Sequence, residues 1–182
     1  MKRSVLIVLG VLAVATSPFA QSNDETIERA LSAAPRQMKE GATVIKWKAD
    51  GTYDTLKKGT NKLVCYDRSG EPGYQPFAVQ CTSLANLDRV KQNMQAEALG
   101  DRAKTQAALD EQEKNGTRVK PEFGSVWLTM SGPDKDHARI HTTVAVPGAT
   151  SQSMGLPDKG GSPGIWIMNA GTTTAHLMIP GS

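Results

Sequence analysis

The N-terminal residues have the pattern of a cleavable export signal, and this determines how much of the chain is left to fold. A short basic start precedes an apolar run over residues 5–15, which is the order found in signal peptides. A membrane-spanning helix needs about 20 apolar residues, so this run is too short to cross a bilayer. We expect a signal peptide over residues 1–22, cleaved after Ala20 or Ser22, and a single soluble domain over residues 23–182. A buried core helix or an uncleaved anchor is the alternative.

Removal of the signal also changes the charge of the protein. The full chain has 21 basic and 18 acidic residues, and two of the basic residues lie in the predicted signal. The remaining domain is therefore close to neutral, which leaves little electrostatic attraction to nucleic acid or to an anionic membrane. The sequence predicts no nucleic-acid partner and no membrane span after the signal is cleaved.

The chain has two cysteines, Cys65 and Cys81. In an exported protein an even pair indicates a disulfide, whereas redox and metal sites use more closely spaced cysteines. The intervening residues include two glycines and two prolines, so we predict a disulfide-stapled loop at 65–81 in a periplasmic or secreted protein. Closing a loop of this size is worth about 3 kcal/mol in the chain-entropy model.

Local patterns predict a short helix and three strands before Cys81. A polar start and a following proline indicate a helix over residues 25–34. Residues 42–48 are rich in β-branched side chains and are followed by a turn and a returning strand over 53–56, which predicts a hairpin. A third strand is expected over residues 63–66.

The middle of the chain predicts helix. Apolar residues recur at intervals of three and four over residues 84–98, which is typical of an amphipathic helix; they are Leu84, Leu87, Val90, Met94 and Ala98. Beyond Gly100 the apolar positions are mostly alanine, so a helix over 101–114 buries little area. We expect a solvated helix there, carrying the carboxylates of 97–113; a mobile arm or a partner surface is the alternative.

The last third of the chain returns to strand patterns. Strands are expected over residues 126–130, 138–146, 165–168 and 174–179, with a loop over 147–164. Strands, then helices, then strands predict an α+β domain. In detail we expect a small, mainly antiparallel sheet with one long central helix and a short N-terminal helix.

The histidines are the candidate metal ligands. Strand alternation places His137 and His141 on the face opposite the apolar one, and it places His176 on the outward face of the last strand. If these two strands pair, His141 and His176 approach each other. Two imidazoles without a placed carboxylate are a weak metal signal, so we expect surface histidines and assign no metal, no cofactor and no catalytic residue.

The tryptophans offer a different kind of site. Trp47, Trp127 and Trp166 have the chemistry to line a sugar or peptide groove. Each lies in an apolar strand pattern, so core packing is the expectation.

Two segments resemble exported bacterial proteins of unknown function. One is the GTN segment that starts at Gly59 and runs to Cys65, together with Cys81, and the other is the C-terminal AGTTTAHLMIP segment over residues 170–180. Lys62 and Thr173 depart from the glycine and proline often found there. The resemblance implies export and a shared fold, and it implies no activity.

These patterns favour a non-enzymatic exported domain that binds an unknown protein or small ligand in the cell envelope. The alternative is a hydrolase or metal-dependent enzyme built on His141 and His176.

Overall fold

An eight-stranded sheet forms the centre of the molecule. The computed structural model describes residues 18–160 and 164–179. The strand order is β2-β1-β3-β4-β5-β6-β8-β7; within the described part of the chain β1 and β3 pair in parallel and all other neighbours are antiparallel. The strands are β1 (Thr43–Trp47), β2 (Tyr53–Lys57), β3 (Leu63–Asp67), β4 (Phe77–Ser83), β5 (Val126–Gly132), β6 (Arg139–Ala145), β7 (Trp166–Met168) and β8 (His176–Ile179).

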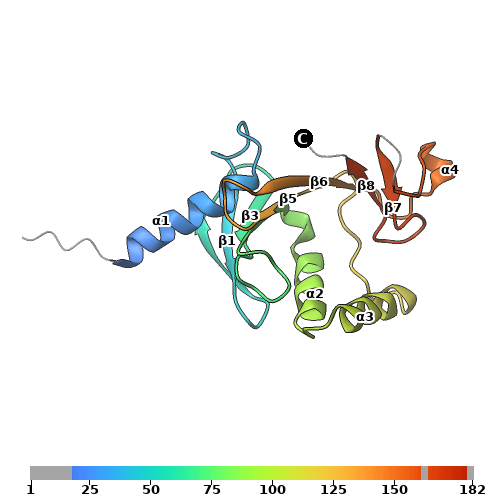
Figure 1. Cartoon of the computed structure of the whole chain (residues 1–182), viewed down its shortest axis with the longest axis horizontal. Helices are drawn as coiled ribbons and strands as arrows, with labels where there is room; N and C mark the ends of the chain where they lie inside the picture. Colours follow the sequence, from blue (N-terminus) through green and yellow to red (C-terminus); the bar gives the residue numbers. More distant parts are fainter. Residues whose placement is uncertain (1–17, 161–163, 180–182) are drawn as a thin grey trace, which may run out of the picture.

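Helices cover both faces of this sheet. They are α1 (Pro18–Ala30), η1 (Leu31–Ala33), η2 (Leu84–Asn86), α2 (Leu87–Glu97), α3 (Arg102–Lys114) and α4 (Ser151–Met154). The helix α1 lies on one side of the sheet, α2 and α3 lie on the other, and α4 lies beside β7 and β8 (Figure 1). Among the described residues, no helix has the length and apolar character needed to span a membrane.

The α+β class is confirmed, but the predicted small sheet and the predicted pair of helices are wrong. The sheet has eight strands, because the glycine- and proline-rich stretch before Cys81 ends in a buried strand, β4, that pairs on both sides. The single long helix is replaced by η2 and α2, with α3 following after a turn. Gly100 makes that turn at φ +72°, a conformation that costs glycine little.

Two apolar clusters pack against opposite faces of the first strands. On one face α1 and η1 cover Val44, Leu63 and Cys65. On the other face α2 places Leu87 and Val90 against a second group of strand side chains; that group contains Ile45, Val64, Tyr66, Trp47 and Trp127. The alternation of β3 therefore sends Cys65 to one core and its neighbours Val64 and Tyr66 to the other.

The N-terminal helix extends further than predicted. It starts at Pro18, ahead of the expected start at residue 25, and proline is well suited to the first position of a helix. Its end continues as η1, and Ala30, Ala33 and Ala34 are buried. Residues 1–17 of the predicted export signal lie outside the described residues.

The predicted disulfide is present, but the segment that it closes is a hairpin. Cys65 and Cys81 are bonded and are directly opposite each other on β3 and β4. Their Cα atoms are 4.1 Å apart, and both residues are buried. The loop proper is limited to residues 68–76, because Phe77 and Val79 fill the core and draw the chain into β4.

The two helical segments of the middle region differ in burial as the alanine content predicts. Leu87 and Val90 of α2 are buried, whereas α3 buries none of its residues 102–114. Leu84 was expected in the core but is 40% exposed. The reason is local. Ser83 caps the short η2 turn, and because Leu84 belongs to this turn and not to α2, it does not share the buried face of that helix.

Candidate functional site

His141 and His176, the candidate metal ligands, lie apart in the structure. The two strands do pair, and the register places both side chains on one face of the sheet, the face that also carries Trp127. However, His176 lies opposite Ala145, and Thr142 lies opposite Ile179. His141 is thus four residues along β6 from the partner of His176, about 13 Å at the usual rise per residue. The strands thus meet the condition for an approach, but their register keeps the two histidines apart.

The three histidines have different surroundings. His141 is exposed, the Nδ1 atom of His176 contacts the Thr174 carbonyl oxygen at 2.7 Å, and His137 pairs with Asp134. Within the described residues no group of three or more His, Cys, Asp or Glu side chains is arranged to hold a metal ion.

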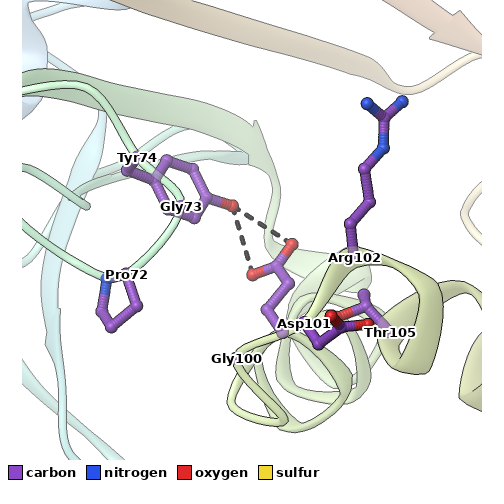
Figure 2. A pocket seen from close by; sticks show the side chains of 8 residues that line it. Pro72, Gly73, Tyr74, Gly100, Asp101, Arg102 and Thr105 are labelled. Atoms are coloured by element: carbon purple, nitrogen blue, oxygen red, sulfur yellow. Dashed lines mark hydrogen bonds between the residues drawn. The ribbon is translucent and has the colours of Figure 1, made fainter.

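A pocket at the corner between α2 and α3 is the strongest candidate site. It has a volume of about 330 Å³. We call it the corner pocket and define it by its lining: Pro72, Gly73, Tyr74, Glu97, Gly100, Asp101, Arg102 and Thr105. The loop between β3 and β4 forms one wall, and the turn from α2 into α3 forms the other (Figure 2).

A buried arginine organises the wall of this pocket. Arg68 is 3% exposed and donates to Glu71 at 2.6 Å and to Glu97 at 2.8 Å. Its guanidinium also stacks on the Tyr74 ring, 4.1 Å from the centroid, which is a favourable cation–π geometry. One cation thus fixes two carboxylates and one aromatic ring that come from the loop and from α2.

Tyr74 and Glu97 meet inside the pocket. The Tyr74 hydroxyl donates to both carboxylate oxygens of Glu97 at 3.2 Å (Figure 2). Asp101 caps the first turn of α3 by accepting from the Lys104 N–H. The Arg102 side chain extends away from Tyr74 (Figure 2). It therefore does not directly neutralise the Glu97 carboxylate that Tyr74 contacts.

The electrostatics of the network follow from burial and from its charges. Burial alone would lower the pKa of Arg68, but Tyr74, Glu97 and Glu71 outweigh burial and raise it. Burial raises the pKa of Tyr74 to about 12, with a contribution from Glu97 and an opposing one from Arg68. At neutral pH Arg68 is therefore charged and Tyr74 is a neutral hydroxyl donor.

The pocket has acceptor capacity to spare. A carboxylate has about four acceptor positions, and Glu97 Oε1 accepts only the shared Tyr74 hydroxyl among the described groups. The Glu97 side chain is 31% exposed. Among the charged groups of the network and the lining, three are carboxylates and two are guanidinium groups. An excess of one negative charge favours a ligand with a cationic hydrogen-bond donor.

A second polar cluster ties α3 to the rest of the domain. Glu113 accepts from the Thr173 N–H at 2.6 Å and from its hydroxyl. Burial alone would raise the pKa of Glu113, but these hydrogen bonds and the nearby Arg89 and Arg118 outweigh burial and lower it. Both arginines are buried, and burial together with Arg118 lowers the pKa of Arg89 to about 10. The carboxylates of 97–113 are thus not all solvated, contrary to expectation.

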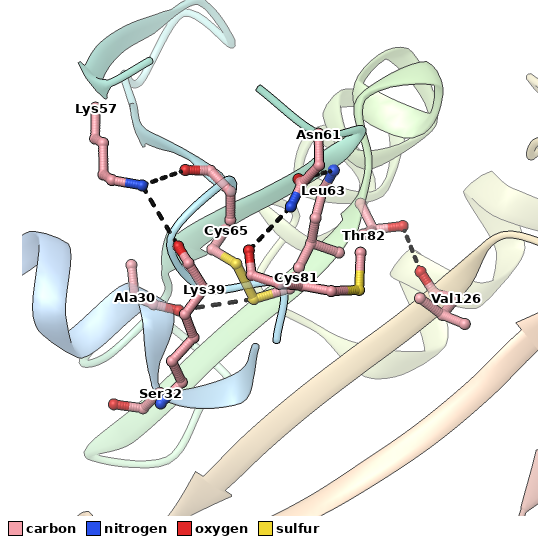
Figure 3. Close-up of a disulfide and its surroundings, with 12 residues drawn as sticks. Ala30, Ser32, Lys39, Lys57, Asn61, Leu63, Cys65, Cys81, Thr82 and Val126 are labelled. Carbon is pink, nitrogen blue, oxygen red and sulfur yellow. Dashed lines mark hydrogen bonds between the residues drawn. A yellow bond between two sulfur atoms is a disulfide. The ribbon is translucent and has the colours of Figure 1, made fainter. Parts of the chain in front are cut away.

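The GTN segment has a structural role beside the disulfide. A side chain at Gly59 would approach the Gly41 carbonyl oxygen to 2.3 Å, so only glycine fits. Asn61 donates to the Met38 carbonyl and accepts from the Leu63 N–H, and Lys57 donates to the Lys39 carbonyl (Figure 3). These contacts hold the segment before β1 close to the strands that carry the disulfide.

Sequence reasoning missed the residues of the corner pocket. Val64, Tyr66 and Arg68 are alternate residues and so point to the same face, the one that α2 covers. A positively charged residue at such a core-facing position could have indicated a buried ion pair. Its partner Glu97 lies 29 residues further on, and no local pattern links the two.

The comparisons with known proteins give no relative. No family model, no curated protein and no solved structure matches the chain. The functional argument therefore rests on the geometry described above.

Proposed function

We propose that this protein is a non-enzymatic exported domain that binds a partner or small ligand of the cell envelope through the corner pocket. The observation that carries the proposal is the Arg68–Glu97–Tyr74 assembly. Binding sites gain affinity when their polar groups are held in place before the ligand arrives, and here a buried guanidinium holds a partly exposed carboxylate. The ligand class that suits the excess negative charge is an ammonium or guanidinium group.

The exported location is part of the same proposal. The buried disulfide fits an oxidising compartment, and the basic start followed by a short apolar run supports export. N-terminal sequencing of the exported protein is expected to begin at Gln21 or Asn23. Retention of Met1 would contradict export.

The pocket chemistry favours binding over catalysis. Its lining combines carboxylates, hydroxyls and one exposed guanidinium, and the rival metal-dependent enzyme needs two histidines that the register separates. Metal analysis of the purified protein tests the rival. Stoichiometric zinc or copper that is lost in His141→Ala or His176→Ala would favour the enzyme.

Calorimetry with putrescine, a small diamine, tests the binding proposal. Protein purified after export is titrated at neutral pH and low salt, since salt screens such contacts. We expect saturable binding that weakens at least fivefold in Glu97→Gln. Glu111→Gln is the matched control, because it removes the same charge from an exposed position on α3. No binding, or equal weakening in both variants, would contradict the proposal.

A further inference from the structure

A second cavity lies at the opposite end of α2, where the hairpin of β1 and β2 faces the start of that helix. It has a volume of about 370 Å³. We call it the aromatic groove and define it by Trp47, Thr52, Tyr53, Leu87, Asp88 and Lys91. The hairpin and α2 are in contact here, because the Lys91 side chain lies over the turn at Gly51.

Aromatic surface forms one bank of the groove. Tyr53 is 43% exposed, and its ring packs edge to face against Trp47 with centroids 5.3 Å apart. Trp47 makes a second edge-to-face contact with Tyr66 on its inner side. The bank is thus a rigid apolar surface that remains open to solvent at Tyr53.

Among the residues that the structure describes, three polar side chains of the groove have no hydrogen-bond or ion-pair partner, whereas the Thr52 hydroxyl donates to Asp50 at 2.6 Å. Within the described residues, no hydrogen bond or ion pair engages the Tyr53 hydroxyl, the Asp88 carboxylate or the Lys91 ammonium group. The indole N–H of Trp47 is buried and also has no acceptor in the described part of the chain. That nitrogen has almost no solvent-exposed surface, so the polar groups open to a ligand are those of Tyr53, Asp88 and Lys91, which a ligand can bond without breaking a protein contact.

The charges of the groove select the class of ligand. Asp88 and Lys91 are three residues apart on one face of α2, and their charges cancel. A cationic ligand would meet Lys91, and an anionic ligand would meet Asp88. A neutral ligand with hydroxyl groups, which both donate and accept, can satisfy the two side chains at once. Its apolar face would lie on the aromatic bank, as is usual in sites that combine aromatic walls with few polar groups.

We infer that the aromatic groove is a binding site for an oligosaccharide of pyranose rings. A pyranose has hydroxyls around its edge and C–H groups on its faces, which matches one polar bank and one aromatic bank. This inference is independent of the corner pocket, which lies at the other end of α2 and has an excess of negative charge.

Heteronuclear NMR of the protein purified after export tests the inference. The probes are chitotriose, maltotriose and a neutral tripeptide of alanine and glycine. We expect at least one saccharide to shift the amides of residues 47–53 and 87–91 saturably. The affinity is expected to fall at least tenfold in Tyr53→Ala and at least threefold in Asp88→Asn.

Arg102→Met, in the corner pocket, is the control variant and should leave saccharide binding unchanged. Circular dichroism checks that Tyr53→Ala is folded, as its exposed edge position predicts. The inference is overturned if neither saccharide binds, if binding survives in Tyr53→Ala, or if the tripeptide binds more tightly than both saccharides.

Discussion

The two ends of α2 carry cavities of similar size that are built in opposite ways. In the corner pocket the polar side chains bond one another, with Arg68 joined to Glu97 and Glu97 to Tyr74. In the aromatic groove the charged ends of Asp88 and Lys91 have no hydrogen bond or ion pair among the described residues. We therefore expect the polar groups of the corner pocket to contribute to both stability and binding, and those of the aromatic groove to contribute to binding alone. Substitutions at the two ends should therefore separate stability from affinity.

The largest expected effect is on stability, at the organising arginine. Arg68→Met removes one cation from two carboxylates and from the face of Tyr74. Loss of one member of a buried pair costs several kcal/mol, but both carboxylates reach water here. We therefore expect a loss of about 2 kcal/mol in the free energy of unfolding, measured by urea denaturation.

Arg102→Met is the matched control for that substitution. Arg102 lines the same pocket but is exposed, so the change is expected to stay within about 0.5 kcal/mol. Equal losses in the two variants would show that Arg68 does not organise the pocket.

Replacing one carboxylate at each end gives the sharpest contrast between the two cavities. Glu97→Gln removes an ion pair with a buried guanidinium, so we expect a loss of about 1 kcal/mol in stability together with weaker putrescine binding. Asp88→Asn is expected to change stability by less than about 0.5 kcal/mol while weakening saccharide binding. If Asp88→Asn destabilises as much as Glu97→Gln, the distinction between the two cavities is wrong.

The smallest expected effect concerns acid and α3, which forms one wall of the corner pocket. The pKa of Glu113 is below its usual 4.5 in the folded state. Its contribution to stability is therefore complete above pH 4.5 and is lost as the pH falls through the folded value. We expect hydrogen-exchange protection of residues 102–114 to fall on acidification before that of 87–97.

Glu113→Gln provides the control for the acid experiment. The variant should have a loosened α3 already at neutral pH and should lack the acid step at this position. If protection of 102–114 equals that of the sheet at every pH, α3 is held by more than its polar ends.

The sequence was sufficient for the elements whose signals are local. The strands of the first hairpin, the pairing of the cysteines and the poor burial of 101–114 follow from alternation, cysteine count and alanine content. The strand β4 was missed because its first residues follow a run of glycine and proline, and only the core contacts of Phe77 and Val79 show why the chain is extended there.

The candidate sites depend on contacts that no local pattern contains. Arg68 and Glu97 are 29 residues apart, and the register that separates His141 from His176 is fixed by the pairing of whole strands. Trp47 was identified from the sequence as a possible groove residue with core packing expected. It is half-buried, because its ring reaches both the core at Tyr66 and the groove at Tyr53.

The most direct test of the central claim is a residue-by-residue NMR titration of the exported protein with putrescine at low salt. We predict saturable shifts confined to residues 72–74 and 97–105, their loss in Glu97→Gln, and no change at 47–53. Shifts spread over the surface, or the same shifts in Glu97→Gln, would contradict the claim that Arg68 and Glu97 form a preorganised binding site.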